Sequence, residues 1–375
     1  MKKIYFNIRT SSRERMWDTI KYSGEICDAI LPHDVIQQSS IKTFTNNNSI
    51  MSKIKYEISK KIINKQTIDK NIVKSVDLIY MWGACPRDNF DKDYIIELDN
   101  PYALSYYHTQ NFHNNSEKIK KILKKAYKIT YLSEASKNNA IELFGDDIIS
   151  KSFVNYPYMN ENFKKRVENS NSSIHFVFVG LNGKYKGGYE LLEAFHNVKK
   201  DNIKLTFVSD LSKTMREKYS CDKRMVLLDP QPREYLLDIL YPSMDIMIFP
   251  SFYESFGVVL LEAMSFGAGI ISTNTYATPE ILKNGINGRL LHHPILRPKM
   301  LGKQETIVCV EQRAEEFYRK YLQNNEFYYG LYSELKMAIE EATINYKQWQ
   351  ENSIKLFEQK FSPKIWLENF KNILE

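Results

Sequence analysis

Residues 245–273 read DIMIFPSFYESFGVVLLEAMSFGAGIIST, and the order of their side-chain types predicts the fold. The short apolar run at 245–249 has the length and composition of a buried strand. A polar loop follows, then a segment suited to a helix at 256–266, then a second apolar run at 269–273. A strand, a helix and a strand in this order form a βαβ unit, and such units build parallel sheets.

The same alternation extends over residues 174–291. Further strand candidates are 174–180, 203–209 and 225–228, and further helix candidates are 188–199, 212–219 and 232–241. Such a series predicts a doubly wound parallel sheet covered by helices. Ligands of these sheets bind at the carboxyl ends of the strands, so we expect the loops at those ends to carry the site.

The first half of the chain shows the same pattern less regularly. We expect strands at 3–8, 76–81, 94–98, 129–132 and 152–155, and a helix at 133–144 between an N-cap serine and Gly145. No strand is assigned within residues 25–74. A chain of 375 residues is too long for one ordinary core. The sequence therefore predicts an α/β protein with two Rossmann-like domains that face each other across a cleft.

The expected domain bounds follow from changes in composition. We expect an N-terminal domain at 1–157, a C-terminal domain at 172–355, and a polar linker between about 156 and 173. Residues 312–372 are rich in Glu, Lys, Tyr and Leu and predict helices. Ser362 as N-cap and Pro363 at the first helical position start a last helix, 363–374. The segment 356–375 is expected to pack back on the N-terminal domain.

Cysteine usage and hydropathy indicate the compartment. The four cysteines lie far apart, without the spacing of a zinc site or a disulfide framework. The N-terminal residues MKKIYFNIRTSSRER lack the apolar stretch of a signal peptide, and no run of about 18 apolar residues predicts a membrane span. We expect a cytoplasmic protein, soluble or peripheral at the inner face of the membrane.

The net charge of +7 is concentrated in lysines of the first 130 residues. The segment from Lys118 to Lys128 places four apolar residues on one face of a lysine-rich helix, namely Ile119, Ile122, Leu123 and Ala126. This helix is either a solvated surface or a peripheral contact for an anionic membrane or a lipid-diphosphate acceptor. Nucleic acid is not expected as a partner, because no recognised module is present and the basic clusters lack interleaved stacking aromatics.

The loop after strand 245–249 carries the strongest candidate site. Phe256 and Gly257 open a helix whose unpaired amides and positive dipole end accept phosphate readily, and Gly257 lets a ligand approach the backbone. Glu254 lies in the loop, where a carboxylate binds sugar hydroxyls, and Glu262 lies two turns into the helix, where it could hold a ribose. Each has a plainer interpretation: a favourable charge near a helix start for Glu254, and a solvated helix face for Glu262.

Three ordered motifs carry a resemblance to a known family. The loop and helix read E-SFGVVLL-E, the residues after it read EAMSFG, GIIST, PE and NGINGRLL, and the residues before it read FVFVG and KGGYELLEAF. Together they resemble glycosyltransferase family four and its relatives with the GT-B fold. The resemblance covers roughly residues 174–291, in the family's order and spacing.

The resemblance implies a nucleotide-sugar-dependent glycosyltransferase. Glu254 would contact the donor sugar, Glu262 the ribose and Lys186 the diphosphate. The other donor-binding residues would be Gly180, Lys184, Ser255, Phe256, Gly257 and Val258. A lysine and helix amides stabilise a leaving diphosphate without a metal. We therefore expect no metal and no cofactor, because the nucleotide-sugar is a co-substrate. The resemblance also implies that the configuration at the anomeric carbon is retained, as is usual in the family.

The chain also departs from the family. Leu181 stands where the family has an arginine. Lys184 is the nearest residue that could supply the second cation on the diphosphate; otherwise it is a solvated loop lysine. Glu97 ends a strand where the family often has a histidine. It is therefore a catalytic candidate, with Glu254 and Lys186. Its alternative role is to cap the turn into Pro101. Candidates for the acceptor side, each with a structural or surface alternative, are Asp99, Asn100, His108 and Arg9. The family's first glycine-rich loop is replaced by arginines, Arg9, Arg13 and Arg15.

These features predict transfer of a sugar to a hydroxyl of a glycan or lipid-linked acceptor, in surface polysaccharide or glycolipid synthesis. Two alternatives stay open: an isomerase of the sugar-nucleotide 2-epimerase kind, and an inactive nucleotide-sugar-binding module. The E-x7-E spacing favours the transferase over the isomerase. Leu181 and the missing glycine loop give the binding module some support.

Overall fold

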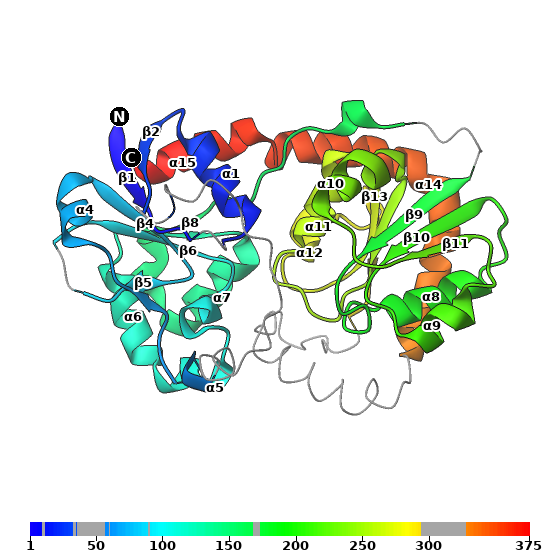
Figure 1. Ribbon diagram of the computed structural model, residues 1–375, viewed down its shortest axis with the longest axis horizontal. Coiled ribbons are helices and arrows are strands. Elements are labelled where there is room, and N and C mark those ends of the chain that lie inside the picture. Colours follow the sequence, from blue (N-terminus) through cyan, green and yellow to red (C-terminus); the bar gives the residue numbers. More distant parts are fainter. Residues whose placement is uncertain are drawn as a thin grey trace. The chain divides into compact units, whose positions relative to one another are not determined.

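The computed structural model describes residues 1–9, 12–32, 35, 57–59, 61–88, 91–167, 173–293 and 328–375. Much of the stretch 25–74, part of the expected linker and residues 312–327 of the expected helical region lie outside them. The described residues form two compact units: Met1–Pro157 with Pro363–Glu375, and Tyr158–Ser362 (Figure 1).

The N-terminal unit is built on a parallel sheet. Within the described residues it has six strands in the order β2-β1-β4-β6-β7-β8, every neighbouring pair being parallel. Their bounds are β1 (Lys2–Phe6), β2 (Cys27–Ile30), β4 (Leu78–Trp82), β6 (Tyr94–Leu98), β7 (Lys128–Tyr131) and β8 (Ser152–Val154). All of β4 is buried, as expected for a central strand covered on both faces. A separate pair joins β3 (Lys65–Gln66) to β5 (Cys85–Pro86).

Helices cover both faces of this sheet, with α1 and α15 on one face and α6 and α7 on the other (Figure 1). The helices are α1 (Glu14–Ser23), α4 (Lys70–Ser75), α5 (Thr109–Asn114), α6 (Ser116–Lys125), α7 (Glu134–Phe144) and α15 (Pro363–Leu374). Short 3-10 helices η1 (Pro101–Ser105) and η2 (Asp146–Lys151) connect them. Ser133 caps α7 by accepting a hydrogen bond from the Ser136 amide, as the sequence predicts. The α15 side chains Trp366 and Phe370 are buried, and the Phe370 ring lies 5.6 Å from that of Tyr80.

Helix α6 does not present the apolar face that the sequence suggests for membrane contact. Ile119, Leu123 and Ala126 are fully buried in the unit's own core. The exposed face of α6 carries lysines, so any contact with an anionic surface would be electrostatic rather than by insertion. Among the helices that the structure describes, none combines the length and apolar character of a membrane span.

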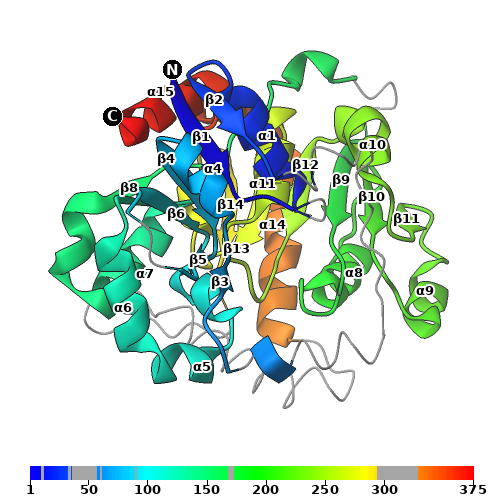
Figure 2. The ribbon, with the colours of Figure 1, turned by 60° about the vertical axis from the view of Figure 1, so that its left-hand side comes forward.

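The C-terminal unit repeats the architecture. Its described strands form a six-stranded parallel sheet in the order β11-β10-β9-β12-β13-β14. Their bounds are β9 (Ile174–Val179), β10 (Ile203–Val208), β11 (Met225–Leu228), β12 (Ile246–Phe249), β13 (Gly269–Thr273) and β14 (Gly288–Leu291). The helices include α8 (Gly188–Asn197), α9 (Lys213–Tyr219), α10 (Arg233–Tyr235), α11 (Val258–Ser265), α12 (Thr278–Ile281) and α14 (Tyr329–Lys360). Figure 2 shows α14 beside β13 and β14, and it also packs on α8.

Three bounds differ from the sequence prediction. Residues 158–167 belong to the C-terminal unit rather than to a linker, because the Asn162 amide binds the Ser265 carbonyl and Arg166 pairs with Asp245. The segment 356–375 is not one element: α14 runs to Lys360, and α15, which belongs to the N-terminal unit, begins at Pro363. The predicted helix 232–241 is α10 followed by a π-helical turn, Leu236–Leu240, and a 3-10 turn, Tyr241–Ser243.

Candidate active site

The start of α11 has the geometry that a phosphate site needs. Gly257 precedes the helix in a left-handed conformation, with φ of 86°, which favours glycine over any other residue. No side chain caps the helix start, so the first amides, from Val258 on, have no side-chain acceptor. The helix follows the carboxyl end of β12 through residues 250–257, where parallel sheets bind ligands.

Lys186 and Glu254 lie together beside this helix start. The Lys186 Nζ donates to Glu254 Oε2 at 2.9 Å and to the Tyr253 carbonyl at 2.9 Å, and it lies 5.6 Å from the centre of the Phe249 ring. The two charged side chains are 24% and 21% exposed, so both remain accessible to a ligand. The structure thus brings together two predicted catalytic residues that are 68 positions apart.

Glycines explain how the Lys186 segment reaches the Glu254 loop. Gly187 has φ of 68°, and a Cβ there would lie 2.2 Å from the Pro250 carbonyl oxygen. A Cβ on Gly188 would lie 2.7 Å from the Phe207 ring, and one on Gly180 would lie 3.1 Å from the Phe249 ring. The Lys186 segment can therefore lie directly against the Pro250 carbonyl because residue 187 has no side chain.

At position 181, where the family has an arginine that contacts the diphosphate, this chain has no cationic side chain. Leu181 is 61% exposed. The Lys184 Nζ lies 5.9 Å from the centre of the Tyr189 ring, and burial lowers the pKa of this lysine despite the nearby carboxylate of Glu190. Lys184 is therefore partly packed rather than a fully solvated loop residue.

Glu262 is not a solvated side chain. It is 14% exposed; its Oε1 lies 3.1 Å from Arg233 Nη2, and its Oε2 accepts from the Tyr241 hydroxyl at 3.3 Å. Burial raises the pKa of Glu262, while the Arg233 charge opposes that shift. Sequence patterns missed Arg233 and Tyr241, because nothing in their spacing marks them as partners of a residue in another helix.

In the N-terminal unit, Glu97 is held by two neighbours. Its Oε1 lies 2.7 Å from Arg15 Nη1, and its Oε2 accepts from the Tyr80 hydroxyl at 2.6 Å. Glu97 is 7% exposed, so this is a positioned, paired carboxylate. The cap for the turn into Pro101 is Asn100 instead, whose Oδ1 accepts from the Tyr102 amide.

Two acceptor-side candidates have structural roles. Asn100 is 1% exposed and serves as the cap of η1, so it is not available to a substrate. His108 precedes α5 and its Nε2 lies 2.9 Å from the Ser59 hydroxyl; it is not among the residues that line the unit's pocket. Asn100 Oδ1 and His108 Nε2 thus make local contacts, and the assignment of both residues to the acceptor side stays a prediction.

A pocket of about 260 Å³ lies in the N-terminal unit at the carboxyl ends of β4 and β6. Asp99 lines it and accepts from the Tyr107 hydroxyl at 3.1 and 3.0 Å. Burial raises the pKa of Asp99, and the hydrogen bond from Tyr107 and the charge of Arg13 oppose that shift. The other lining residues are Arg13, Arg15, Met16, Asn64, Trp82, Gly83, Glu97, Ala103, Tyr106 and Tyr107. Arg9 is exposed, and its charge acts on Tyr106, one of these residues.

No cluster of three or more His, Cys, Asp or Glu side chains that could hold a metal ion occurs among the described residues. The expectation of a metal-free reaction stays a prediction.

Two parallel-sheet α/β units define the GT-B fold class of glycosyltransferases, and solved structures share this fold over the whole chain. The Anabaena protein Alr3699/HepE, solved in complex with UDP, is 15% identical with a TM-score of 0.65, over 100% of this chain and 99% of that one. The lipopolysaccharide outer core galactosyltransferase WaaB is 13% identical with a TM-score of 0.58, over 99% of both chains. These likenesses establish the fold.

Sequence comparison then identifies the C-terminal unit more closely. Residues 159–304 match the family model described as glycosyl transferases group 1, so the chain carries a glycosyltransferase domain of this group. A D-inositol 3-phosphate glycosyltransferase of Corynebacterium efficiens is 34% identical over 106 residues, 27% of this chain and 25% of that protein. An uncharacterised 41.2 kDa protein in the cps region of Klebsiella pneumoniae is 28% identical over 134 residues, 35% of this chain and 37% of that protein. The matched stretches thus span only about a quarter to a third of these relatives.

Proposed function

We propose that the chain transfers a sugar from a nucleotide-sugar to an acceptor hydroxyl. The single observation that carries this proposal is the contact between Lys186 and Glu254 beside the α11 start, inside the glycosyltransferase domain. Both residues stand at the positions that the family resemblance implies for diphosphate and donor-sugar contacts. The N-terminal pocket is the proposed place for the acceptor.

The chemistry of the leaving group explains the residue types. When the bond from sugar to phosphate breaks, negative charge grows on the diphosphate while the sugar becomes cationic. A lysine ammonium and the amides of residues 255–258 stabilise the phosphate charge, and Glu254 holds the sugar hydroxyls. Glu262, oriented by Arg233 and Tyr241, binds the ribose. This arrangement supports a reaction that needs no metal, with the family's retained anomeric configuration.

The comparisons support the finer parts of the proposal. Alr3699/HepE was solved with UDP and with UDP-glucose, which makes uridine diphosphate sugars the first donors to test. The galactosyltransferase WaaB acts on lipopolysaccharide outer core, and the Klebsiella relative is encoded in a cps region. We propose a cytoplasmic role in surface polysaccharide or glycolipid synthesis, with membrane contact, where it occurs, made by the exposed lysines of α6.

Nucleotide binding tests the donor site. UDP at about a hundredfold excess over its dissociation constant should stabilise the full-length protein by about 3 kcal/mol. Lys186→Met should remove most of that stabilisation, because the diphosphate loses its cation, and Lys213→Met, an exposed lysine on α9, should not. The measurement is thermal unfolding with and without a panel of nucleoside diphosphates. The donor assignment fails if none of them shifts the unfolding temperature of the unmodified protein.

A further inference from the structure

Glu190 is a buried acid in the segment that follows the donor lysine. It lies in the first turn of α8, four positions after Lys186, and it is 0% exposed. Its Oε1 accepts a hydrogen bond from the Tyr328 amide at 2.8 Å, and its Oε2 has no hydrogen-bond partner among the described residues. Burying a carboxylate costs free energy that one hydrogen bond only partly offsets, so such a group next to a candidate binding loop is itself a candidate for function.

Two helix starts meet at this carboxylate. Glu190 is in the first turn of α8, and Tyr328, whose amide it binds, is the residue before α14. The Tyr328 side chain makes no capping hydrogen bond, so Glu190 supplies an acceptor to the α14 start from a different helix. The positive dipole ends of both helices favour a negative charge here. Because Glu190 is fully buried between elements that pack on each other, any effect on a ligand is through its charge and not through contact.

The charge of Glu190 changes near neutral pH. Burial raises its pKa to about 7, although backbone hydrogen bonds and the charge of Lys184 oppose that shift. Lys184, in the loop before α8, is the cation that acts on Glu190 within the described part of the chain. From α9, the Tyr219 hydroxyl is also within reach of the Glu190 charge; burial and its hydrogen bond to Glu193 raise its pKa, so it stays neutral. From α14 the contact is the uncharged Tyr328 amide.

The segment that leads into α8 carries the two lysines considered for the donor diphosphate, Lys184 and Lys186. An ionised Glu190 attracts Lys184, and it repels any anion that this segment binds, because charges interact more strongly where water is excluded. A protonated Glu190 does neither. The two states of one buried group thus give the loop two affinities for the same anion.

We propose that Glu190 controls the affinity of loop 180–187 for a nucleoside diphosphate, which binds more tightly when Glu190 is protonated. Binding then takes up a proton from solvent at Glu190, because a ligand that prefers the protonated form shifts the group toward that form. Identifying the loop as the donor site rests on the proposed function. Glu190 is not a catalytic residue, since it touches no substrate and acts through Lys184 and its own charge.

The test is calorimetric titration of the full-length protein and of Glu190→Gln with UDP between pH 6 and 8.5. Glutamine keeps the size of the side chain and an acceptor for the Tyr328 amide, but it does not ionise. The affinity of Glu190→Gln relative to the unmodified protein should be close to one at pH 6 and about fivefold to tenfold higher by pH 8.5. The titration of UDP itself cancels in this ratio. Glu217→Gln, an exposed glutamate on α9, should give a ratio of one at every pH.

A second measurement counts the protons. Titration at pH 7.5 in two buffers of different ionisation enthalpy should show that the unmodified protein takes up about half a proton with UDP, and Glu190→Gln almost none. Phosphate titrates near pH 6, so UDP contributes little at this pH. The count on the unmodified protein also tests the proposal if Glu190→Gln does not fold, because binding without proton uptake contradicts it.

The proposal is overturned by an affinity ratio that stays at one at every pH. A ratio that falls below one as the pH rises also overturns it, because the ionised carboxylate would then hold Lys184 in its binding position. A protein that binds UDP with a constant ratio and without proton uptake keeps its donor assignment and loses only this role of Glu190. Failure of the unmodified protein to bind any nucleoside diphosphate removes the donor assignment and this proposal together.

Discussion

Lys186 and Glu254 show how much the proposed donor site depends on glycine. The lysine reaches the glutamate because Gly187 turns in a left-handed conformation directly against the Pro250 carbonyl. An ordinary residue would need about 1 to 2 kcal/mol for that conformation alone. A Cβ at 2.2 Å from the carbonyl oxygen would in addition force the two loops apart.

Gly187→Ala should therefore destabilise the protein by more than the backbone conformation alone costs, which is about 1 to 2 kcal/mol. We expect it to lower the free energy of unfolding by more than Gly285→Ala, since Gly285 has a similar φ of 73° but open space around its Cβ position. UDP affinity should fall in Gly187→Ala and stay unchanged in Gly285→Ala. Chemical denaturation and nucleotide titration measure both effects. Equal unfolding free energies and equal affinities in the two variants would show that the loop contact is unimportant.

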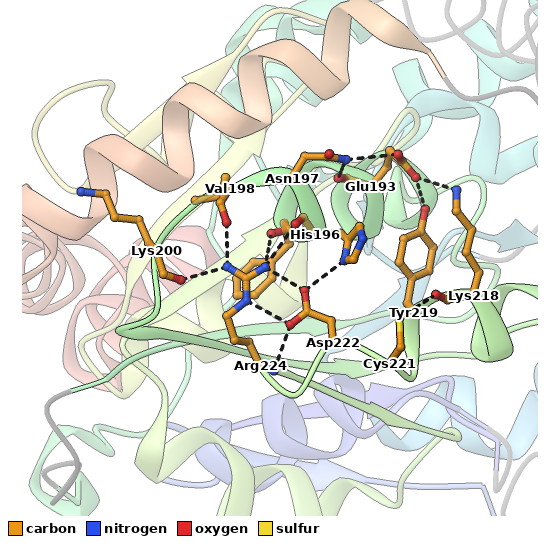
Figure 3. A network of polar contacts seen from close by, with 11 residues as sticks. Glu193, His196, Asn197, Val198, Lys200, Lys218, Tyr219, Cys221, Asp222 and Arg224 are labelled. Atoms are coloured by element: carbon orange, nitrogen blue, oxygen red, sulfur yellow. Dashed lines mark hydrogen bonds and ion pairs between the residues drawn. The ribbon is translucent and has the colours of Figure 1, made fainter.

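At the scale of single elements, α8 links the donor loop to the body of the C-terminal unit. The helix starts at Gly188, directly after Lys186 and Gly187, and its other end is held by Arg224 (Figure 3). The Arg224 guanidinium donates to carbonyls at the end of α8 and beyond, those of Phe195, His196, Val198 and Lys200. The hydrogen bond from Arg224 lowers the pKa of Asp222 to about 2, so this carboxylate stays charged and holds the arginine in place.

Replacing Arg224 should loosen the whole helix. Arg224→Met leaves several carbonyls without a donor and should cost about 2 to 3 kcal/mol of unfolding free energy. Lys213→Met is the control, because Lys213 is 90% exposed and pairs only loosely with Glu217 at 3.8 Å, and surface pairs contribute about 1 kcal/mol or less. Urea unfolding of both variants measures the difference. If both cost the same, Arg224 does not hold the end of α8.

The sequence predicts elements well where apolar residues are continuous. Strands β9, β10, β12 and β13 fall within a residue or two of their expected bounds, because each is a run of β-branched and aromatic side chains between polar loops. Strand β2 is missed because its four residues, CDAI, include a charged Asp28 and give no pattern. The break after α10 is missed because a π-helical turn of five residues is too short to change the apolar pattern that predicts a helix.

The candidate site, too, can be predicted from the sequence only in part. Lys186, Glu254 and Glu262 are candidates from sequence alone because they lie in motifs of fixed local spacing. The partners that hold Glu262 and Glu97, namely Arg233, Tyr241, Arg15 and Tyr80, come from other elements and have no local signature.

At the scale of the whole molecule, each unit has its own core and its own pH response. In the C-terminal unit the sheet residue His175 is buried, with its Nδ1 2.9 Å from the Ser243 carbonyl and its Nε2 2.8 Å from the Thr206 hydroxyl. These contacts suit a neutral imidazole that donates from Nδ1 and accepts at Nε2. Burial, helped by the charge of Lys204, lowers the pKa of His175 to about 4, although Ser243 and Asp245 oppose that shift.

This histidine should make the fold acid-sensitive. Its pKa in the folded state lies below the usual 6.5, so the unfolded chain binds more protons, and stability is lost as the pH falls from about 6.5 toward 4. The full effect is at most about 3 kcal/mol. His175→Gln should flatten the decline between pH 6.5 and 5, where most carboxylates are still charged. Denaturation at a series of pH values measures the slopes, and identical slopes in both proteins would contradict a neutral buried His175.

The measurement that tests the central claim most directly is release of nucleoside diphosphate from a nucleotide-sugar by the full-length protein and by Glu254→Gln. The account predicts that the variant keeps the thermal unfolding temperature of the unmodified protein but turns over at least about a hundredfold more slowly, as when one preorganised polar contact to a transition state is removed. Glu217→Gln, an exposed glutamate on α9, should turn over at the unmodified rate. An undiminished rate in Glu254→Gln would contradict the assignment of this loop as the donor site.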